Sequence, residues 1–472
     1  MPQPDYDSLP PLFTQLQACL QHGWEQEVLC HLPADYEQQA RQTGAFVRAR
    51  GLSCVGDLLR GLLAYVLCAP SLRHLGAWAV LSGVANLSHV AWLKRLRQAR
   101  PWLLWLLIER LAISTPAMVE PLAQRRIVLI DATRLKEPGG TGDDWRVHLG
   151  YDLLAGRLLD ARVSDRHTAE GFTLFGLQAG DLVVADRGYC RRGQLAYALR
   201  CGAHLVVRLA VHQVPLLDAQ GSSFDVVRWL KTLGRGQHHC LVAFEHEGHR
   251  FCGRLIACSL PAEEAERART KQRQKAAKKQ RQLKEETLFL CGWLLLLTSL
   301  SAHDWSQEQV VALYRARWQV ELVIKRMKQV LKLAQLRGQT ASTNEATILA
   351  LLLAWALLQE EIQHARHLLT EAAEQWALSL CVASGSSPLP TCSLPTVSSW
   401  SVTALCVQTL RLLVQGCWTF AHLRRCLPDR QRFRCSRRRQ RDHQESTMRR
   451  QLLLHLAPMV PDSSLMFSCS SA

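Results

Sequence analysis

One short segment in the C-terminal half carries an acid, two cations and a phenol at helical spacing. The segment Tyr314–Lys328 reads YRARWQVELVIKRMK. At about 100° per residue, its Tyr314, Arg317, Glu321 and Lys328 fall on one narrow stripe, and its apolar residues fall on the opposite side. The pattern predicts an amphipathic helix with a charged front that could bind an anion and a cation together. A helix face that only meets solvent would give the same pattern, so the stripe alone does not distinguish a binding surface from a solvated one.

Two upstream segments each end an apolar run on an aspartate. Arg126–Thr133 and Asp181–Tyr189 are rich in aliphatic and β-branched residues, which predicts two buried strands that present Asp131 and Asp186 at their ends. Two strand-end aspartates and one helix glutamate suit Mg²⁺, a hard ion that prefers oxygen ligands. Three such carboxylates can hold two ions about 3.5–4 Å apart, the arrangement used for in-line phosphoryl transfer.

Other acids near the first aspartate are competing metal ligands. Most of them fall in predicted turns or on polar strand faces, where they would meet solvent. They are Asp143, Asp144, Asp152, Asp160 and Asp165.

The motif residues resemble a known family. The spacing from Tyr314 through Arg317 and Glu321 to Lys328 is similar to the Y-(2)-R-(3)-E-(6)-K signature of bacterial insertion-sequence transposases of the DDE type, the insertion-sequence-four family. The run Asp186-Arg187-Gly188-Tyr189 resembles that family's second-aspartate motif. The resemblance covers roughly residues 50–375.

The resemblance implies an RNase-H-like catalytic domain and a role for each motif residue. It implies that three carboxylates bind two Mg²⁺ ions, with Mn²⁺ as a substitute: Asp131, Asp186 and Glu321. It implies that five further side chains hold phosphates beside the cleaved bond: Arg187, Tyr189, Tyr314, Arg317 and Lys328.

Composition points to a nucleic-acid partner. The 472 residues predict two or three domains, and 48% hydrophobic residues can form a substantial core. A formal net charge of +17 favours binding to a polyanion, although a ribosome-associated or membrane-surface protein would also be basic. The 17 cysteines are scattered without a C-x-x-C pair, and the longest apolar runs are too short to span a bilayer. We therefore expect free thiols, no membrane segment, and a bacterial cytoplasmic, nucleoid-associated protein.

Residues 1–115 have a helical pattern throughout. The stretch Ser71–Trp78 leads through Gly83 and Ser88 into a cationic helix, the order of a helix-turn-helix DNA reader. The cations proposed to contact DNA there are Lys94, Arg95 and Arg97. A plain helical bundle with a basic face is the alternative.

The segment 120–375 predicts an α/β fold, an RNase-H-like catalytic core interrupted by an insertion. Three antiparallel strands lead to a helix at 168–178, the Asp186 strand, a helix at 192–201 and a strand at 203–209. The surplus of residues before Glu321 predicts an insertion at about 210–289, with strand-like runs at 226–230 and 240–244, and the family resemblance implies that this insertion is mainly β.

Outside these strands, the chain is expected to be helical or irregular. The insertion contains Arg267–Lys284, with nine Lys or Arg and no acid, and its Lys275 and Lys278 could contact DNA. A solvated connector would explain it equally well. A helical C-terminal region, a linker at 383–402 and a basic tail at 403–472 follow.

The leading hypothesis is Mg²⁺-dependent cleavage and strand transfer at the ends of an insertion sequence. The partners would be double-stranded DNA, both terminal inverted repeats and target, and a second copy of the chain in the DNA complex. Two alternatives stay open on sequence grounds: an RNase-H-like nuclease without strand transfer, and an inactive DNA-binding relic.

Overall fold

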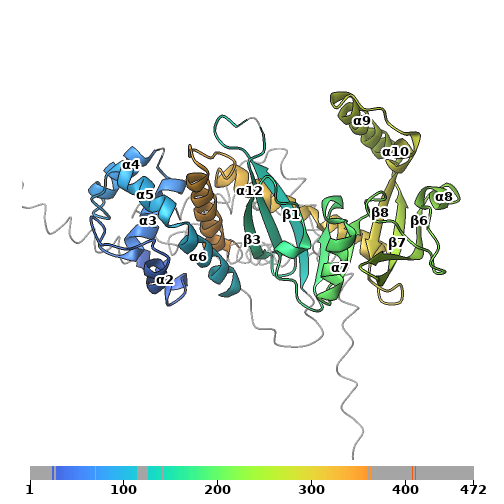
Figure 1. Ribbon diagram of the computed structural model, residues 1–472, viewed down its shortest axis with the longest axis horizontal. Helices are drawn as coiled ribbons and strands as arrows, with labels where there is room; N and C mark the ends of the chain where they lie inside the picture. The colour runs from blue at the N-terminus through green and yellow to red at the C-terminus, as the bar shows by residue number, and fades with distance from the viewer. Residues whose placement is uncertain are drawn as a thin grey trace, which may run out of the picture.

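The computed structural model describes most of the chain between residues 24 and 359. The described residues are 24–25, 28–69, 71–113, 126–140 and 142–359, with 362, 407 and 410. The predicted linker at 383–402 and nearly all of the predicted tail lie outside them. Figure 1 shows the N-terminal helices at one end of the molecule, a sheet in the middle, and two helices projecting beyond its far edge.

The N-terminal part is helical, as predicted. Its elements are η2 (Leu29–His31), α2 (Tyr36–Gln42), α3 (Val55–Leu67), α4 (Leu72–Leu81), α5 (His89–Gln98) and α6 (Arg100–Ile113). Ser71 and Ser88 cap α4 and α5 by accepting hydrogen bonds from His74 and Ala91 backbone N–H groups. Gly83 takes a positive φ of 69° in the turn between them, a conformation that glycine adopts at little cost. The predicted helix, turn and cationic helix are therefore present.

One eight-stranded mixed sheet forms the centre of the molecule. Its strands are β1 (Ile127–Leu135), β2 (Trp145–Asp152), β3 (Arg157–Asp165), β4 (Leu182–Ala185), β5 (His204–Arg208), β6 (Gln237–His246), β7 (His249–Ser259) and β8 (Trp293–Thr298). The strand order is β3-β2-β1-β4-β5-β8-β7-β6. The pairs β1/β4 and β4/β5 are parallel, and the other pairs are antiparallel. The hairpin β6–β7 thus extends the main sheet through β8.

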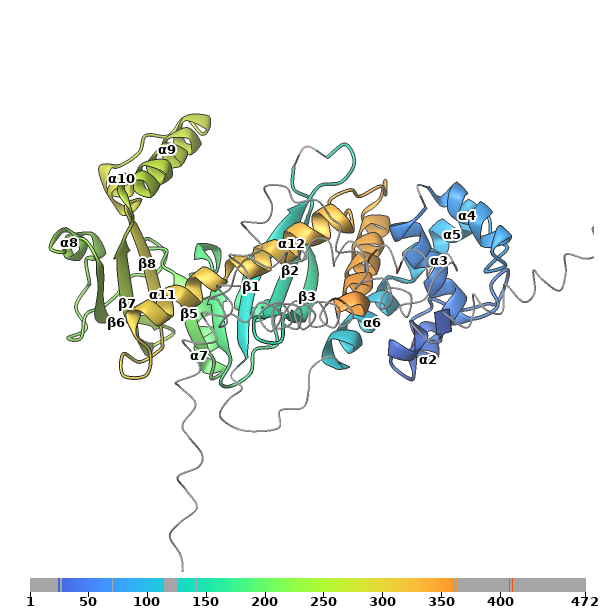
Figure 2. The same ribbon diagram turned by 180° about the vertical axis from the view of Figure 1, so that it is seen from behind.

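Helices cover both faces of this sheet. The helices that follow the first three strands are η3 (Phe172–Leu174), η4 (Arg187–Tyr189), α7 (Arg192–Arg200), α8 (Val226–Lys231), α9 (Ala262–Lys278), α10 (Glu285–Leu290), α11 (Gln307–Ala316) and α12 (Trp318–Val330). Figure 2 shows α11 and α12 crossing one face, while Figure 1 shows α7 on the other. Two apolar cores result: Leu129 and Val184 pack on the α12 side, and Ile130 and Ala185 pack on the α7 side.

Two predicted elements differ from the structure. The helix expected at 168–178 is wrong: a loop leads into the short η3, because Asp165 accepts hydrogen bonds from the backbone of His167 and Thr168 and holds a turn there. The strand expected at 226–230 is also wrong. Asp225 caps Arg228 N–H, and the apolar residues of this run bury one side of α8 instead.

The motif helix begins after Ser306, as predicted, and is interrupted once. Ser306 forms a capping box with Gln309. At Arg317 the backbone stays helical, but Arg317 N–H bonds to Tyr314 and Val320 N–H bonds to Arg317, three residues back, so α11 and α12 are separate. Tyr314 belongs to α11, and the other three motif residues belong to the boundary and to α12.

A long apolar helix, Ala341–Gln359, joins the sheet to the N-terminal helices. It is long and apolar enough to cross a membrane, but 83% of its apolar window is buried inside the protein, as in a core helix. Gln359 accepts a hydrogen bond from Leu158 N–H of β3. At its other end, Thr343 accepts a hydrogen bond from Arg97 at 3.0 Å, and Glu345 pairs with Arg100 at 2.6 Å.

Candidate active site

The two aspartates lie side by side because of the parallel register of β1 and β4. Ile130 pairs with Ala185, and the next residue on each strand is Asp131 and Asp186. Each aspartate follows Leu129 or Val184 by two residues, so both begin on the sheet face that α12 covers. The strand β4 ends at Ala185 while β1 continues to Leu135, so Asp131 lies where the two strands part. We call the region of Asp131, Asp186 and Glu321 the notch.

Arg317 connects Asp131 of the notch to the motif glutamate. Its Nη1 lies 3.4 Å from Asp131 Oδ2, and its Nη2 donates to Glu321 Oε1. The Arg317 and Asp131 side chains are largely buried, with 16% and 18% of their surface exposed. Burial works against the charge of Arg317, but Glu321, Tyr314 and Asp131 raise its pKa above the usual value. Arg317 is therefore a permanent cation between two of the three predicted carboxylates.

The charges of the other two carboxylates act on Asp131. Burial, with smaller contributions from the charges of Asp186 and Glu321, raises the pKa of Asp131 to about 6 against the opposing effect of Arg317. Carboxylates that destabilise each other's charge in a partly desolvated notch favour a bound cation. Among the described residues, no three Asp, Glu, His or Cys side chains lie close enough together to form a metal site on their own. The carboxylate oxygens of Asp131, Asp186 and Glu321 are nevertheless hard donors of the kind that suits a divalent ion.

A second cluster beside the notch is cationic. Arg187 begins η4 after Asp186, and Arg208 ends the neighbouring strand β5. Partial desolvation and the charge of Arg208 lower the pKa of Arg187. Within the described part of the chain, neither arginine is ion-paired with an acid, and Arg208 Nε is buried without a hydrogen-bond partner. Tyr314 lies against this cluster, because the charges of both Arg208 and Asp186 act on its hydroxyl.

Sequence reasoning missed Arg208. It ends an apolar strand that carries no motif, and only the pairing of β4 with β5 brings it near Arg187. The one signal in the sequence was a cation at the end of a buried strand.

The other two predicted phosphate ligands differ in exposure. Lys328 is half-buried, donates to Arg134 O at 3.4 Å, and lies near enough to Asp131 and Asp143 to sense both charges. Burial still lowers the pKa of Lys328 below its usual value. Tyr189 is fully buried, so its hydroxyl can reach only groups inside the protein.

The competing acids all have local partners. Asp143 pairs with Arg134, and Asp160 pairs with Arg162. The other three accept backbone N–H groups in turns: Asp144, Asp152 and Asp165. Their oxygens are used to fix loops, which agrees with the predicted turn positions.

The predicted DNA-contacting cations outside the notch fall into two groups. Arg95 donates to Arg48 O at 2.7 Å, and Arg97 is used in the contact with Thr343. The others are exposed: Lys94 on α5, and Lys275 and Lys278 on α9 beyond its Glu–Arg pairs.

The free thiols expected from the sequence agree with the structure. Among the described residues, no disulfide bond is present, and Cys190 and Cys258, for example, are buried thiols.

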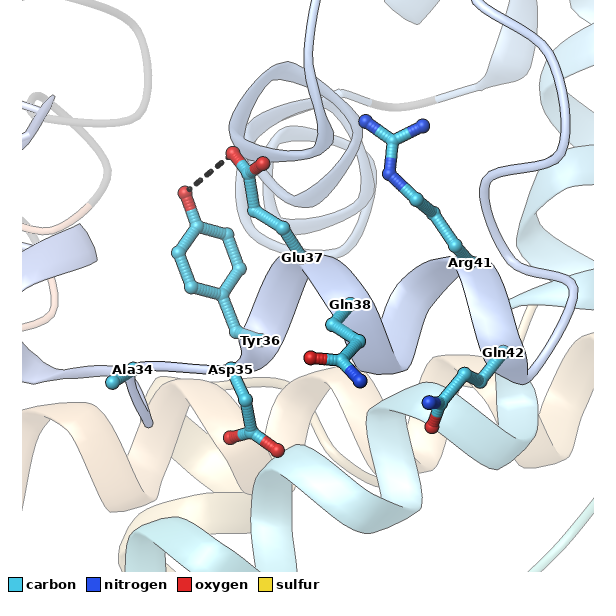
Figure 3. A pocket seen from close by; sticks show the side chains of 7 residues that line it. All are labelled: Ala34, Asp35, Tyr36, Glu37, Gln38, Arg41 and Gln42. Carbon is cyan, nitrogen blue, oxygen red and sulfur yellow. Dashed lines mark hydrogen bonds between the residues drawn. The ribbon is translucent and has the colours of Figure 1, made fainter.

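A surface hollow of about 670 Å³ lies on α2, far along the chain from the carboxylates. Figure 3 shows its polar side chains, with Tyr36 donating to Glu37 at 3.3 Å. It is open and lined by one short segment, Ala34–Gln42, so it brings together no residues from different elements. The notch is the better site.

Comparison with known proteins matches this part of the chain. Residues 122–357, which contain both clusters, match the transposase DDE domain family. The transposase InsL of insertion sequence element IS186A from Escherichia coli is 37% identical over 345 residues, 71% of this chain and 93% of the relative. The transposase of IS421 from Escherichia coli is 37% identical over 349 residues, with the same shares covered. The transposase of IS231D from Bacillus thuringiensis is 23% identical over 277 residues, 52% of this chain and 58% of the relative.

Proposed function

The chain belongs to the DDE transposases of insertion-sequence elements, and we propose that Asp131, Asp186 and Glu321 are its catalytic carboxylates. It is thus an enzyme of DNA cleavage and strand transfer, and its family generally uses divalent metal ions. The mixed sheet with helices on both faces is consistent with an RNase-H-like core. The Tyr-Arg-Glu-Lys spacing supports assignment to the insertion-sequence-four family.

The single observation that carries this proposal is the mutual influence of the three carboxylates. The register of β1 and β4 brings two of them together, and Arg317 ties Asp131 to Glu321. In our proposal these three side chains hold two Mg²⁺ ions, with Mn²⁺ as a substitute. Bound ions of this kind activate an attacking oxygen and stabilise the leaving oxygen of a phosphodiester.

The cationic side chains would position the phosphate. Arg187 and Arg208 have no acidic partner among the described residues, so a phosphate oxygen would supply the acceptors that they lack. Arg317, which lies between Asp131 and Glu321, would donate to a phosphate oxygen held beside them, and Tyr314 would donate its hydroxyl. Lys328 would neutralise charge at the other side of the notch.

The remaining partners follow from the reaction. The DNA partner would carry the terminal inverted repeats and then the target, read in part by α4–α5 and contacted by α9 through Lys275 and Lys278. Because two ends must be joined, the DNA complex would contain two copies of the chain. The site of action would be the bacterial cytoplasm, on nucleoid DNA.

The test is Mg²⁺-dependent cleavage and strand transfer on DNA that carries the cognate ends. The matched pair is Glu321→Gln and Glu308→Gln, because Glu308 lies on α11, faces solvent and is not part of the notch. We expect Glu321→Gln to abolish both reactions while DNA binding persists, and Glu308→Gln to behave as the native chain. Activity that survives in Glu321→Gln would refute the glutamate assignment. Binding without activity in the native chain would identify an inactive relic.

A further inference from the structure

Glu170 lies beside the second aspartate of the notch. It lies in the loop between β3 and η3. Its carboxylate packs directly on the backbone of Gly188, where an added Cβ would collide with Glu170 Oε2 and lie 3.0 Å from Asp186 Oδ1. Glu170 and Asp186 therefore flank the same glycine, within a few ångström of each other. Any side chain at residue 188 would push them apart.

The Tyr189 hydroxyl points to a missing partner at the same place. Tyr189 is fully buried and stacks on Phe172 at 5.4 Å between ring centroids, yet its hydroxyl has no hydrogen-bond partner. Burial raises the pKa of Tyr189, and the charges of Glu170, Asp131 and Asp186 raise it further. A buried hydroxyl without a hydrogen-bond partner lowers the stability of the folded protein. We therefore expect a bound group beside these three carboxylates to supply the partner of the Tyr189 hydroxyl.

The charge of Glu170 is only partly neutralised within the protein. Arg146 of β2 lies 3.7 Å away, too far for a hydrogen bond, and donates instead to the carbonyl of Thr168. The Glu170 side chain keeps 22% of its surface exposed. It can therefore still bind a cation from its position next to Asp186.

We propose that Glu170 is a fourth carboxylate of the metal site. This inference rests on the metal site proposed above. Asp131, Asp186 and Glu321 would then hold the divalent ions together with Glu170, which lies beside Asp186 at Gly188. Gly188 is required because it lets the fourth carboxylate approach.

The test measures Mn²⁺ binding to the full-length protein without DNA, by the loss of the free-ion electron paramagnetic resonance signal. Glu170→Gln keeps the shape of the side chain and removes its charge, and we expect affinity to fall by about 10-fold or more. Glu245→Gln, at an exposed position of β6, removes the same charge at a distance and should bind as the native chain does. Thermal unfolding without metal would show that the variants are folded.

Arg146→Gln separates a direct role from a structural one. If Glu170 binds the ion, removing its cationic neighbour should leave Mn²⁺ affinity unchanged or increase it. If Glu170 serves only to hold Arg146, both variants should weaken binding equally, and the proposal is wrong. Affinity of Glu170→Gln within twofold of native, while Asp186→Asn loses binding, would also overturn it. Native affinity in Asp186→Asn and Asp131→Asn would instead refute the metal site itself.

Discussion

The arginines of the N-terminal helices and those at the ends of β4 and β5 are used in different ways. Arg95, Arg97 and Arg100 each find an acceptor within the protein: a carbonyl, a hydroxyl or a carboxylate. Arg187 and Arg208 instead face each other across two strand ends without an acid in the described part of the chain. Folding alone does not favour the second arrangement, because two neighbouring like charges repel, although Arg187 is exposed and Arg208 is only half-buried. This difference supports the proposal that Arg187 and Arg208 bind a phosphate.

Removing Arg208 tests most directly whether the arginines at the ends of β4 and β5 differ in role from those of the N-terminal helices. We expect Arg208→Gln to slow single-turnover cleavage by about 10²–10³-fold, the loss typical of one donor to a charged transition state. Because it removes a repulsive, half-buried charge, the midpoint of thermal unfolding should stay the same or rise. The measurements are cleavage rate at saturating DNA and thermal unfolding of the DNA-free protein.

Arg200→Gln is the control for Arg208. Arg200 ends α7 and already pairs with Glu247 at 2.9 Å on the surface, so its loss should leave cleavage unchanged. If Arg208→Gln instead unfolds the protein and cleaves at the native rate when folded, the arginine is structural and the contrast with the N-terminal helices disappears.

His148 is a further basic side chain, and its surroundings inside the protein keep it neutral. It therefore shows a third way in which the fold treats a basic group. Burial and the charge of Arg146 lower the pKa of His148 to about 4, its Nε2 lies 2.8 Å from Ser164 Oγ, and Arg162 lies opposite on β3. The unfolded chain binds a proton below pH 6.5 and the native protein does not. Stability should therefore fall as pH decreases from about 6.5 to about 4, by up to about 3 kcal/mol.

Chemical unfolding of the native chain and of His148→Asn across that pH range tests this. The variant lacks the titrating ring, so the difference in unfolding free energy between the two proteins should shrink as the pH is lowered. Parallel curves at all pH values would show that His148 is charged in the folded state.

Local patterns predicted the parts of the site that depend on neighbours in sequence. An apolar run that ends on an acid indicated Asp131 and Asp186, and a four-residue stripe indicated the motif helix. Ser306 and Ser88 marked helix starts because a cap acts within one turn. These features are set by the chain within a few residues, and the structure reproduces them.

The parts that the sequence did not predict depend on register between distant segments. Arg208 meets Arg187 only because β4 pairs with β5, and Glu170 meets Asp186 only across the backbone of Gly188. The helix expected at 168–178 hid Glu170, since a loop rather than a helix delivers it to the notch. The apolar residues of 226–230 also led to the wrong prediction of a strand, because Asp225 caps this segment and it forms the helix α8.

The smallest expected effects distinguish two cations of the same helix, Arg97 and Lys94 on α5. Arg97 donates to Thr343 across 246 positions of sequence, so Arg97→Gln should lower the unfolding free energy by about 1 kcal/mol and leave DNA binding nearly unchanged. Lys94 is exposed, so Lys94→Gln should leave stability unchanged and, if α5 lies on DNA, reduce the slope of log affinity against log salt by about 0.9. Equilibrium unfolding and salt-dependent binding to DNA carrying the element ends measure the two quantities on the same proteins. The opposite pattern, with Arg97 changing the salt slope and Lys94 changing stability, would mean that internal acceptors do not distinguish structural from DNA-binding cations in this protein.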